Sequence, residues 1–346
     1  MKSYLLYLLK KRIPVVITYS VILFVIYLSF SVVNIKDMIL VAAISLCGLC
    51  VITPIIEFSF KMNKLSAHQA YSFPISRRNL YLTRYIIGFI ELIIPFIAIS
   101  FPFMIINEAM VDGGQHAILV IFELIIPASV LYSYFVFFFT RANSMLDGVV
   151  ILLLSIASPM AILFLVCKVT EPFNPTLFET YDSLSIAGTP FSMVLAYVRN
   201  ISGFDRLISI CMVIFYYVLG VASIVFFVLS SKQFSNDDVG HTTESWFGYR
   251  TLLPILAFYS VINVSWVIVV LYVVGLYFGC ALYTRKLTSK KLWLLFAVRI
   301  CCLTIGLVVS GLISDTATIT SIEGGLYEKN INIYNCNVFF SMSCFM

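Results

Sequence analysis

Long apolar runs separated by short polar segments dominate the amino-acid sequence. A helix needs about 20 apolar residues to cross the hydrocarbon core of a bilayer, and the chain reaches this length repeatedly. The runs are continuous rather than alternating, which favours membrane-spanning helices over the strands of a barrel. The sequence predicts such helices at 13–33, 38–60, 85–106, 116–139, 148–167, 207–230 and 292–313.

One further apolar run, residues 251–284, is 34 residues long and has basic residues on both flanks. Arg250 precedes it, and four Lys/Arg residues follow it between positions 285 and 291. We prefer a hairpin that enters and leaves the membrane on one side, because it keeps both flanks in the cytoplasm, where basic loops belong. The alternative is one tilted crossing, which places the four charges outside.

The composition agrees with this pattern. Hydrophobic residues make up 61% of the chain and charged residues 11%, against about 45–50% and about 25% in a soluble domain. No soluble core could absorb this excess, so the predicted fold is an all-α, polytopic bundle of transmembrane helices in a lipid bilayer. The net charge of +5 does not indicate nucleic acid, because the basic residues cluster at the ends of apolar runs, where they set orientation.

Charge bias predicts the orientation of the spans. Segment 61–84 carries five Lys/Arg residues and no Asp or Glu, which marks it as cytoplasmic because basic loops stay on the side from which spans insert. Segment 107–115 carries Glu108 and Asp112 but no basic residue, so we expect it outside, together with the long segment 168–206. The chain is thus expected in the cell membrane as a multi-pass protein with a cytoplasmic N-terminus.

The basic segment contains a candidate docking element. Ser76 stands as an N-cap before a short helical stretch in which Leu80, Leu82 and Ile86 are spaced for one apolar face. Apolar contacts would anchor a soluble partner, while the Arg77–Arg78 pair would fix its orientation by pairing with carboxylates. The alternative is that these arginines only hold the loop at anionic lipid headgroups.

Three acidic residues lie in or at the edges of the predicted spans. Burying an ionised carboxylate in hydrocarbon is costly, so each must face protein, water or a partner. Glu57 is placed to pair with Lys61 one helical turn further on. Glu91 lies roughly 10 Å inside Arg84 at about 1.5 Å per helical residue, and Glu123 is similarly deep from the outer side. Glu91 and Glu123 either face an internal cavity or fill a satisfied polar site between helices.

No pattern in the sequence indicates catalysis, a cofactor or a resident metal. There is no GxxxxGK[ST] phosphate loop, so we expect the chain not to bind ATP in the manner of a P-loop NTPase. The three histidines are scattered and form neither an HExxH motif nor a catalytic triad. Cys47 and Cys50 form a CxxC pair in mid-span, without a second pair or a nearby histidine, and we interpret them as small hydrophobes. We therefore expect no enzyme activity in this chain.

Residues 70–95 resemble part of a known transporter family. Their sequence is AYSFPISRRNLYLTRYIIGFIELIIP, which is similar to a run, YSLPISRK-x-L-x-x-x-KY, that precedes the third span in membrane subunits of bacterial ABC-2-type exporters, especially permeases of Gram-positive bacteria. Two weaker similarities are GTPFSMVLAYV at 188–198 and SSKQFSNDDVGHTTESWF at 230–247. In layout, the resemblance covers residues 1–250.

The resemblance implies a six-span permease core over 1–250, whose cytoplasmic elements contact a separately encoded ABC ATP-binding subunit. Two permease copies, identical or paired with a paralogue, would enclose the path, and residues 191–198 would form outer-leaflet or re-entrant helices. Additional spans over 251–313 would follow, and then a polar extracellular tail over 314–346 that resembles only the beginning of a domain found in some relatives. The coupling surface would comprise Tyr71, Pro74, Ser76, Arg77, Arg78 and Leu80.

The sequence thus predicts a permease subunit that exports a hydrophobic or amphipathic substrate with ATP hydrolysed by a partner. Two other classes stay open: an ion-coupled secondary transporter that uses Glu91 and Glu123, and an intramembrane enzyme or sensor. No inverted repeat is visible, which argues against the secondary transporter. An ATPase gene beside this one would favour the exporter.

Overall fold

A computed structural model describes residues 2–33, 38–110, 116–170, 189–199 and 206–231, together with residues 293, 294, 297 and 301. Most of the predicted spans over 251–313, and the tail over 314–346, lie outside the described residues. Backbone contacts divide the chain into two compact units, 1–160 with 182–252 and 161–181 with 253–346. Residues 2–33, 38–110, 116–160, 189–199 and 206–231 all belong to the first unit.

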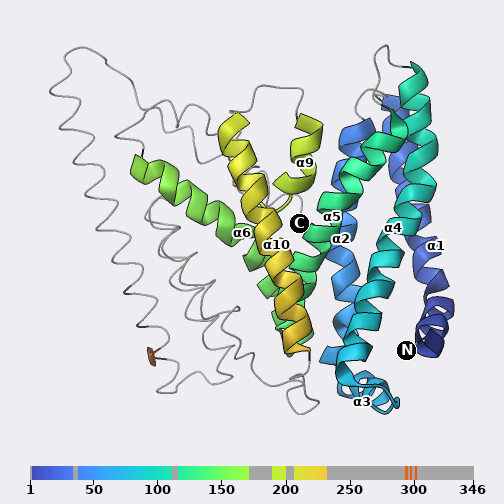
Figure 1. Cartoon of the computed structure of the whole chain (residues 1–346), viewed down its shortest axis with the longest axis vertical. Helices are drawn as coiled ribbons and strands as arrows, with labels where there is room; N and C mark the ends of the chain where they lie inside the picture. The colour runs from blue at the N-terminus through green and yellow to red at the C-terminus, as the bar shows by residue number, and fades with distance from the viewer. Residues whose placement is uncertain are drawn as a thin grey trace. The chain divides into compact units, whose positions relative to one another are not determined.

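All elements of the described part are helices, and Figure 1 shows the long ones with the short α3 at one end. They are α1 (Lys2–Val33), α2 (Met38–Phe58), η2 (Ser59–Met62), α3 (Lys64–Tyr71), α4 (Arg77–Met110), α5 (Ala117–Thr140), α6 (Met145–Thr170), α9 (Ser192–Arg199) and α10 (Arg206–Ser230). The helix α9 falls on the predicted short element 191–198.

The described elements are helices, which confirms the predicted all-α bundle. The length and apolar composition of these helices make the chain a multi-pass membrane protein. The run 148–167 lies in α6, where Met145–Pro159 is a shorter apolar helix, so a sixth crossing stays a prediction. Five helices among the described residues are long and apolar enough to cross a membrane: Tyr4–Ser31, Met38–Met62, Arg77–Ala109, Ala117–Thr140 and Val213–Ser230.

Two helices begin earlier than the apolar pattern predicts. α1 starts at Lys2 rather than near residue 13, and α4 starts at Arg77 rather than at residue 85. Lys and Arg are good helix formers, so backbone hydrogen bonding continues through the charged residues that end the apolar runs. With 34 residues at about 1.5 Å each, α4 is longer than one crossing of a ~30 Å hydrocarbon core requires.

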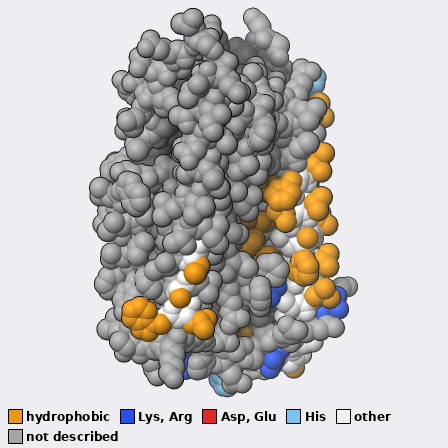
Figure 2. Space-filling model, turned by 90° about the vertical axis from the view of Figure 1, so that its left-hand side faces the viewer, with side chains coloured by type: hydrophobic (Ala, Val, Ile, Leu, Met, Phe, Trp, Pro, Cys, Tyr) orange, Lys and Arg blue, Asp and Glu red, His pale blue; other side chains and the backbone are white. Residues whose placement is uncertain are grey.

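The helices α2 and α5 form the centre of this unit. α2 packs against α1, α4, α5 and α9, and α5 packs against α2, α4, α9 and α10. The buried share of the apolar span is 61% in α5 and 50% in α2, but only 17% in α1 and 22% in α10. α1 and α10 therefore turn most of their surface outward. Figure 2 shows hydrophobic side chains along one flank, with Lys and Arg towards its lower end.

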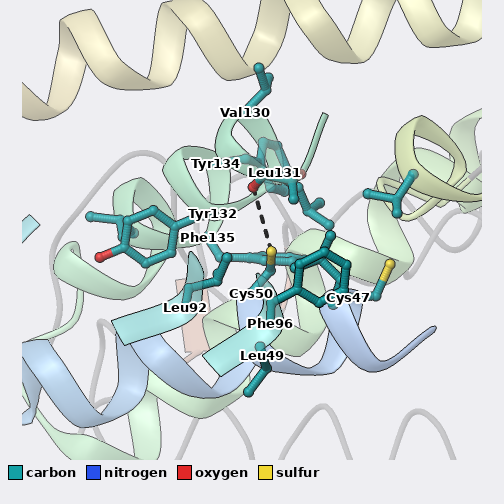
Figure 3. Packing of buried hydrophobic residues seen from close by; sticks show 14 of the residues in the cluster. Cys47, Leu49, Cys50, Leu92, Phe96, Val130, Leu131, Tyr132, Tyr134 and Phe135 are labelled. Carbon is teal, nitrogen blue, oxygen red and sulfur yellow. Dashed lines mark hydrogen bonds between the residues drawn. The ribbon is translucent and has the colours of Figure 1, made fainter. Parts of the chain in front are cut away.

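The middle of the bundle is filled by apolar side chains of α2, α4 and α5 (Figure 3). Phe96 and Phe135 are completely buried there. Cys47 and Cys50 are buried as free thiols, and the Cys50 thiol donates to the carbonyl oxygen of Ala128 at 3.5 Å. Thiols in such surroundings behave as small hydrophobes, which is the role that the sequence predicted for this pair.

The helices α5 and α10 touch at Gly220. A Cβ atom built on Gly220 would collide with the Cγ1 atom of Val130 and lie 3.1 Å from the Val130 carbonyl oxygen, so the helices must move apart to accept it. We expect Gly220→Ala to destabilise the protein by about 1–3 kcal/mol, as overpacked core positions do, and so to lower the midpoint of thermal unfolding.

The matched control for this prediction is Gly48→Ala. Nothing lies within 4 Å of a Cβ atom built on Gly48, and alanine has the higher helix propensity, so the unfolding midpoint should stay the same or rise. Equal midpoints for the two alanine variants would contradict the close packing of α10 on α5.

Candidate functional site

The helix α3 lies at one end of the bundle, between α2 and α4 (Figure 1), and we call this the α3 end. Asn63 begins the helix, because its side-chain oxygen Oδ1 accepts a hydrogen bond from the backbone N–H of Leu65 at 3.0 Å. Within α3, Ala67 and Ala70 are buried, whereas Leu65 is 72% exposed. The apolar pattern did not predict this helix, because half of its eight residues are polar and the helix is far too short for a span; the N-cap Asn63 was the available signal.

The turn between α3 and α4 is fixed at both ends. Ser76 caps α4 as predicted, because its Oγ atom accepts a hydrogen bond from the backbone N–H of Asn79 at 3.4 Å. The hydroxyl groups of Tyr71 and Tyr81 lie 2.7 Å apart and join α3 to the first turns of α4. The turn at 72–76 therefore presents one defined surface.

The structure divides the six predicted coupling residues into two groups. Tyr71 is half-buried, with the guanidinium of Arg77 5.7 Å from its ring centroid. Leu80 is only 1% exposed, because the apolar face of this helix turns into the core, so it cannot contact a partner directly. The exposed members form what we call the basic loop surface: Pro74, Ser76, Arg77 and Arg78.

Phe73 connects this turn to the start of α1. Its ring centroid lies 5.1 Å from that of Tyr4 and 6.3 Å from that of Tyr7. Both Phe73 and Tyr7 remain partly exposed. The first turns of α1 therefore lie next to the basic loop surface, a neighbourhood that the sequence does not reveal because its parts are far apart along the chain.

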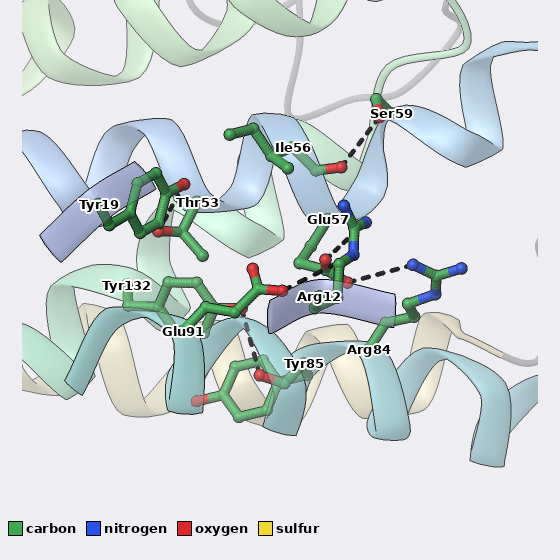
Figure 4. Close-up of polar contacts among 10 residues, drawn as sticks. All are labelled: Arg12, Tyr19, Thr53, Ile56, Glu57, Ser59, Arg84, Tyr85, Glu91 and Tyr132. Carbon is green, nitrogen blue, oxygen red and sulfur yellow. Dashed lines mark hydrogen bonds and ion pairs between the residues drawn. The ribbon is translucent and has the colours of Figure 1, made fainter. Parts of the chain in front are cut away.

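Four charged side chains from three helices meet inside the bundle near the α3 end (Figure 4), and we call them the charge cluster. Arg12 Nη2 lies 2.6 Å from Glu57 Oε1, and Arg12 Nε lies 3.6 Å from Glu91 Oε1. Arg84 Nη1 lies 3.3 Å from Glu57 Oε2. The side chains of Glu57 and Glu91 are 0% and 1% exposed, so both carboxylates are removed from solvent.

Gly88 of α4 allows α2 to come close to the charge cluster. A Cβ atom built on Gly88 would lie 3.2 Å from the Cγ atom of Glu57 and would collide with the hydroxyl of Tyr132. Tyr132 donates this hydroxyl to the carbonyl oxygen of Tyr85 at 3.2 Å. The Glu57 side chain is 0% exposed, and burial strengthens its attraction to the arginines because the local dielectric is low.

The predicted pairing of Glu57 with Lys61 is wrong. Arginines on two other helices, Arg12 and Arg84, reach the Glu57 carboxylate instead. The Lys61 ammonium, which is 3% exposed, donates hydrogen bonds to the carbonyl oxygens of Thr140 at 2.5 Å and of Ala142 at 3.2 Å. These carbonyls stand at the end of α5, where helix geometry leaves them without helical partners.

The structure separates the two carboxylates predicted inside the membrane. Glu91 occupies a polar site between helices, beside Arg12 in the charge cluster. Glu123 is exposed on α5 beside the exposed Phe122, and within the part of the chain that the structure describes its side chain makes no ion pair or hydrogen bond. Glu91 and Glu123 therefore do not form one site.

Sequence reasoning missed the role of Arg12. It stood in a basic flank, Lys10–Arg12, whose charge predicts only which side of the membrane it faces. No spacing rule in the sequence pairs it with Glu57, because that contact joins different helices. Among the described residues, no group of three or more His, Cys, Asp or Glu side chains is placed to hold a metal ion.

Comparisons with protein-family models, with curated proteins and with solved structures gave no match for this chain. The fold itself defines the class: a polytopic, all-α membrane protein. Within this class, the basic loop surface and the charge cluster are the two features from which a function can be argued.

Glu57 is the counter-charge of two arginines, so we expect Glu57→Gln to be strongly destabilising. Removing one partner of a buried ion pair costs about 3–5 kcal/mol when the remaining charge is left unpaired. Among the described residues, Glu57 is the one carboxylate that forms an ion pair with Arg84. The measurement is the midpoint of thermal unfolding of the purified protein. Glu123→Gln removes an exposed carboxylate with the same chemical change and should leave the midpoint unchanged; similar losses in both variants would contradict the special role of Glu57.

Proposed function

We propose that the chain is a membrane-spanning permease subunit of an ABC transporter, which exports a hydrophobic or amphipathic substrate with ATP hydrolysed by a separate ATP-binding subunit. The basic loop surface carries this proposal, because it offers exposed arginines on a turn that is fixed at both ends. The sequence contains no phosphate loop, so the energy of ATP has to come from another protein. The resemblance of residues 70–95 to ABC-2-type permeases supports a coupling role for the same segment.

A partner held at the basic loop surface can act on the spans directly. α4 runs as one helix from Arg77, within this surface, to Met110. The hydroxyl contact between Tyr71 and Tyr81 ties α3 to α4, so the turn and the span move together. Bidentate pairing of arginines with carboxylates would fix the orientation of the partner.

The orientation and assembly of the subunit are part of the proposal. We place the α3 end in the cytoplasm, because exposed basic side chains gather there and basic segments stay on the insertion side. The outward faces of α1 and α10 are available for lipid and for a second permease copy or a paralogue. The exposed basic residues at the α3 end are Lys10, Lys11, Lys64, Arg77 and Arg78.

The geometry does not favour the ion-coupled secondary transporter. Such a transporter would need its carboxylates to converge on one path near the middle of the membrane. Glu91 is enclosed by the charge cluster, whereas Glu123 is exposed on another helix. The exporter therefore remains the proposal that the described residues support best.

The proposed orientation predicts the accessibility of two single cysteines, placed in a chain whose native cysteines are replaced. Asp112→Cys should react with a membrane-impermeant maleimide in intact cells, because segment 107–115 would be outside. Lys64→Cys, at the exposed start of α3, should react only after the membrane is opened. The opposite labelling pattern would overturn the orientation.

The double variant Arg77→Glu with Arg78→Glu tests the coupling surface. We expect it to insert normally but to lose co-purification with an ABC ATP-binding subunit co-expressed from the same genome, since repulsion replaces pairing with the partner's carboxylates. Transport should be lost together with this association.

The control is Lys10→Glu with Lys11→Glu, which makes the same change in charge on exposed residues of the same end of the bundle. It should keep the ATP-binding subunit. If both double variants lost the subunit equally, the basic residues would act only through net charge at anionic headgroups. If neither lost it, the coupling surface would lie elsewhere.

A further inference from the structure

Arg12 lies between two carboxylates on different helices, and its guanidinium is closer to one of them than to the other. Its Nη2 atom is 2.6 Å from Glu57 of α2, within hydrogen-bond distance, whereas its Nε atom is 3.6 Å from Glu91 of α4. Within the part of the chain that the structure describes, neither oxygen of the Glu91 carboxylate has a hydrogen-bond partner, and the same is true of Glu57 Oε1, although both side chains are buried. A buried polar group in this situation calls for a physical explanation.

The pairing within the charge cluster is uneven. Arg12 and Arg84 lie 2.6 Å and 3.3 Å from the Glu57 carboxylate, whereas Arg12, at 3.6 Å, is the one ion-pair partner of Glu91 among the described residues. If Arg12 moved from Glu57 to Glu91, Glu57 would keep Arg84, and each carboxylate would then have one arginine. In the present arrangement Glu91 keeps Arg12 at 3.6 Å, and after the exchange Glu57 would keep Arg84, so each carboxylate has an arginine nearby in both arrangements. Breaking a buried ion pair is costly when it leaves a charge without a partner.

We propose that Arg12 exchanges between Glu57 and Glu91, so that α1 has two ion-paired positions against α2 and α4. Small helix shifts of about 1–2 Å are a common form of switching, because packed interfaces have discrete arrangements. Of the described spans, α1 has the smallest buried share, 17%, but it also packs along α4, where the hydroxyl groups of Tyr27 and Ser100 lie 2.8 Å apart. The shift must therefore keep these contacts. α2 and α4, in contrast, are packed closely together at Gly88.

The exchange would connect the basic loop surface to α1. Phe73 in the turn contacts Tyr4 and Tyr7 of α1, and Arg84 lies two helical turns after Arg77 on α4, with its guanidinium 4.8 Å from the ring centroid of Phe60. Movement of the turn at 72–76 would therefore reach α1 through Phe73. It would reach Arg84, the arginine that stays with Glu57, through the first turns of α4. This link to transport rests on the proposed function, but the exchange itself does not.

A double-mutant cycle on thermal unfolding of the purified full chain tests the exchange. Glu91→Gln alone should change the unfolding midpoint little, because Glu91 makes no hydrogen bond. The combined Glu57→Gln and Glu91→Gln variant should lose more than the sum of the two single losses, because Glu91 no longer receives Arg12. Glu57→Asp, which retracts the carboxylate by one methylene, replaces Glu57→Gln in the cycle if the latter is too unstable to purify.

The same cycle in an Arg12→Gln background separates exchange from simple repulsion between the two carboxylates. Exchange requires Arg12, so the non-additive loss should disappear in this background, whereas repulsion would persist or grow. Additive losses with Arg12 present, or a non-additive loss that survives its removal, would overturn the proposal. Failure of the ATP-binding subunit to bind would count against the proposed function alone, since the cycle uses only this chain.

Discussion

A completely buried carboxylate determines how three helices of this protein meet. Glu57 sits at the end of α2 with 0% of its side chain exposed, and a buried charge is tolerated only when it is paired. Its partners are Arg12 of α1 and Arg84 of α4, so the ion pairs join the three helices near the α3 end. This matters in a bilayer, where lipid is as apolar as the helix surfaces and the hydrophobic effect does not drive helices together.

The organisation of the α3 end follows from the same constraint. Because two arginines satisfy Glu57, Lys61 is directed to the carbonyl oxygens at the end of α5, which anchors the segment between α2 and α3. Arg84 brings the first turns of α4 close to α2, and the contact between Tyr71 and Tyr81 then closes the turn that displays Arg77. The exposed arginines therefore lie on a turn that is held in place by the contacts of Lys61, Arg84 and Tyr81.

The sequence predicted the class of fold well, and the site only in part. Apolar run length is a property of one segment, so five spans and the Ser76 cap could be predicted. The pairing of Glu57 could not, because the spacing rule for one helix suggests Lys61 and says nothing of a distant arginine that folding brings near. Leu80 shows the same limit: of the predicted apolar face Leu80, Leu82 and Ile86, only Leu80 is buried, and the sequence could not show which of these residues packs inward.

The helices of this unit are held by two different kinds of contact, and this difference bears on which of them can move. α4 joins α2 and α5 through buried aromatic rings and the close approach at Gly88, and such packing tolerates little displacement. α1 has the smallest buried share of the described spans, but one of its faces packs along α4, and Arg12 supplies ion pairs to α2 and α4. Packing energy falls steeply with small displacements, whereas an arginine can keep a partner by turning its long side chain. α1 is held by both kinds of contact, because Leu8, Leu23 and Tyr27 are buried against the bundle while Arg12 makes ion pairs near the α3 end. The ion pairs of α1 can therefore adjust with a smaller loss of energy than its packed residues can.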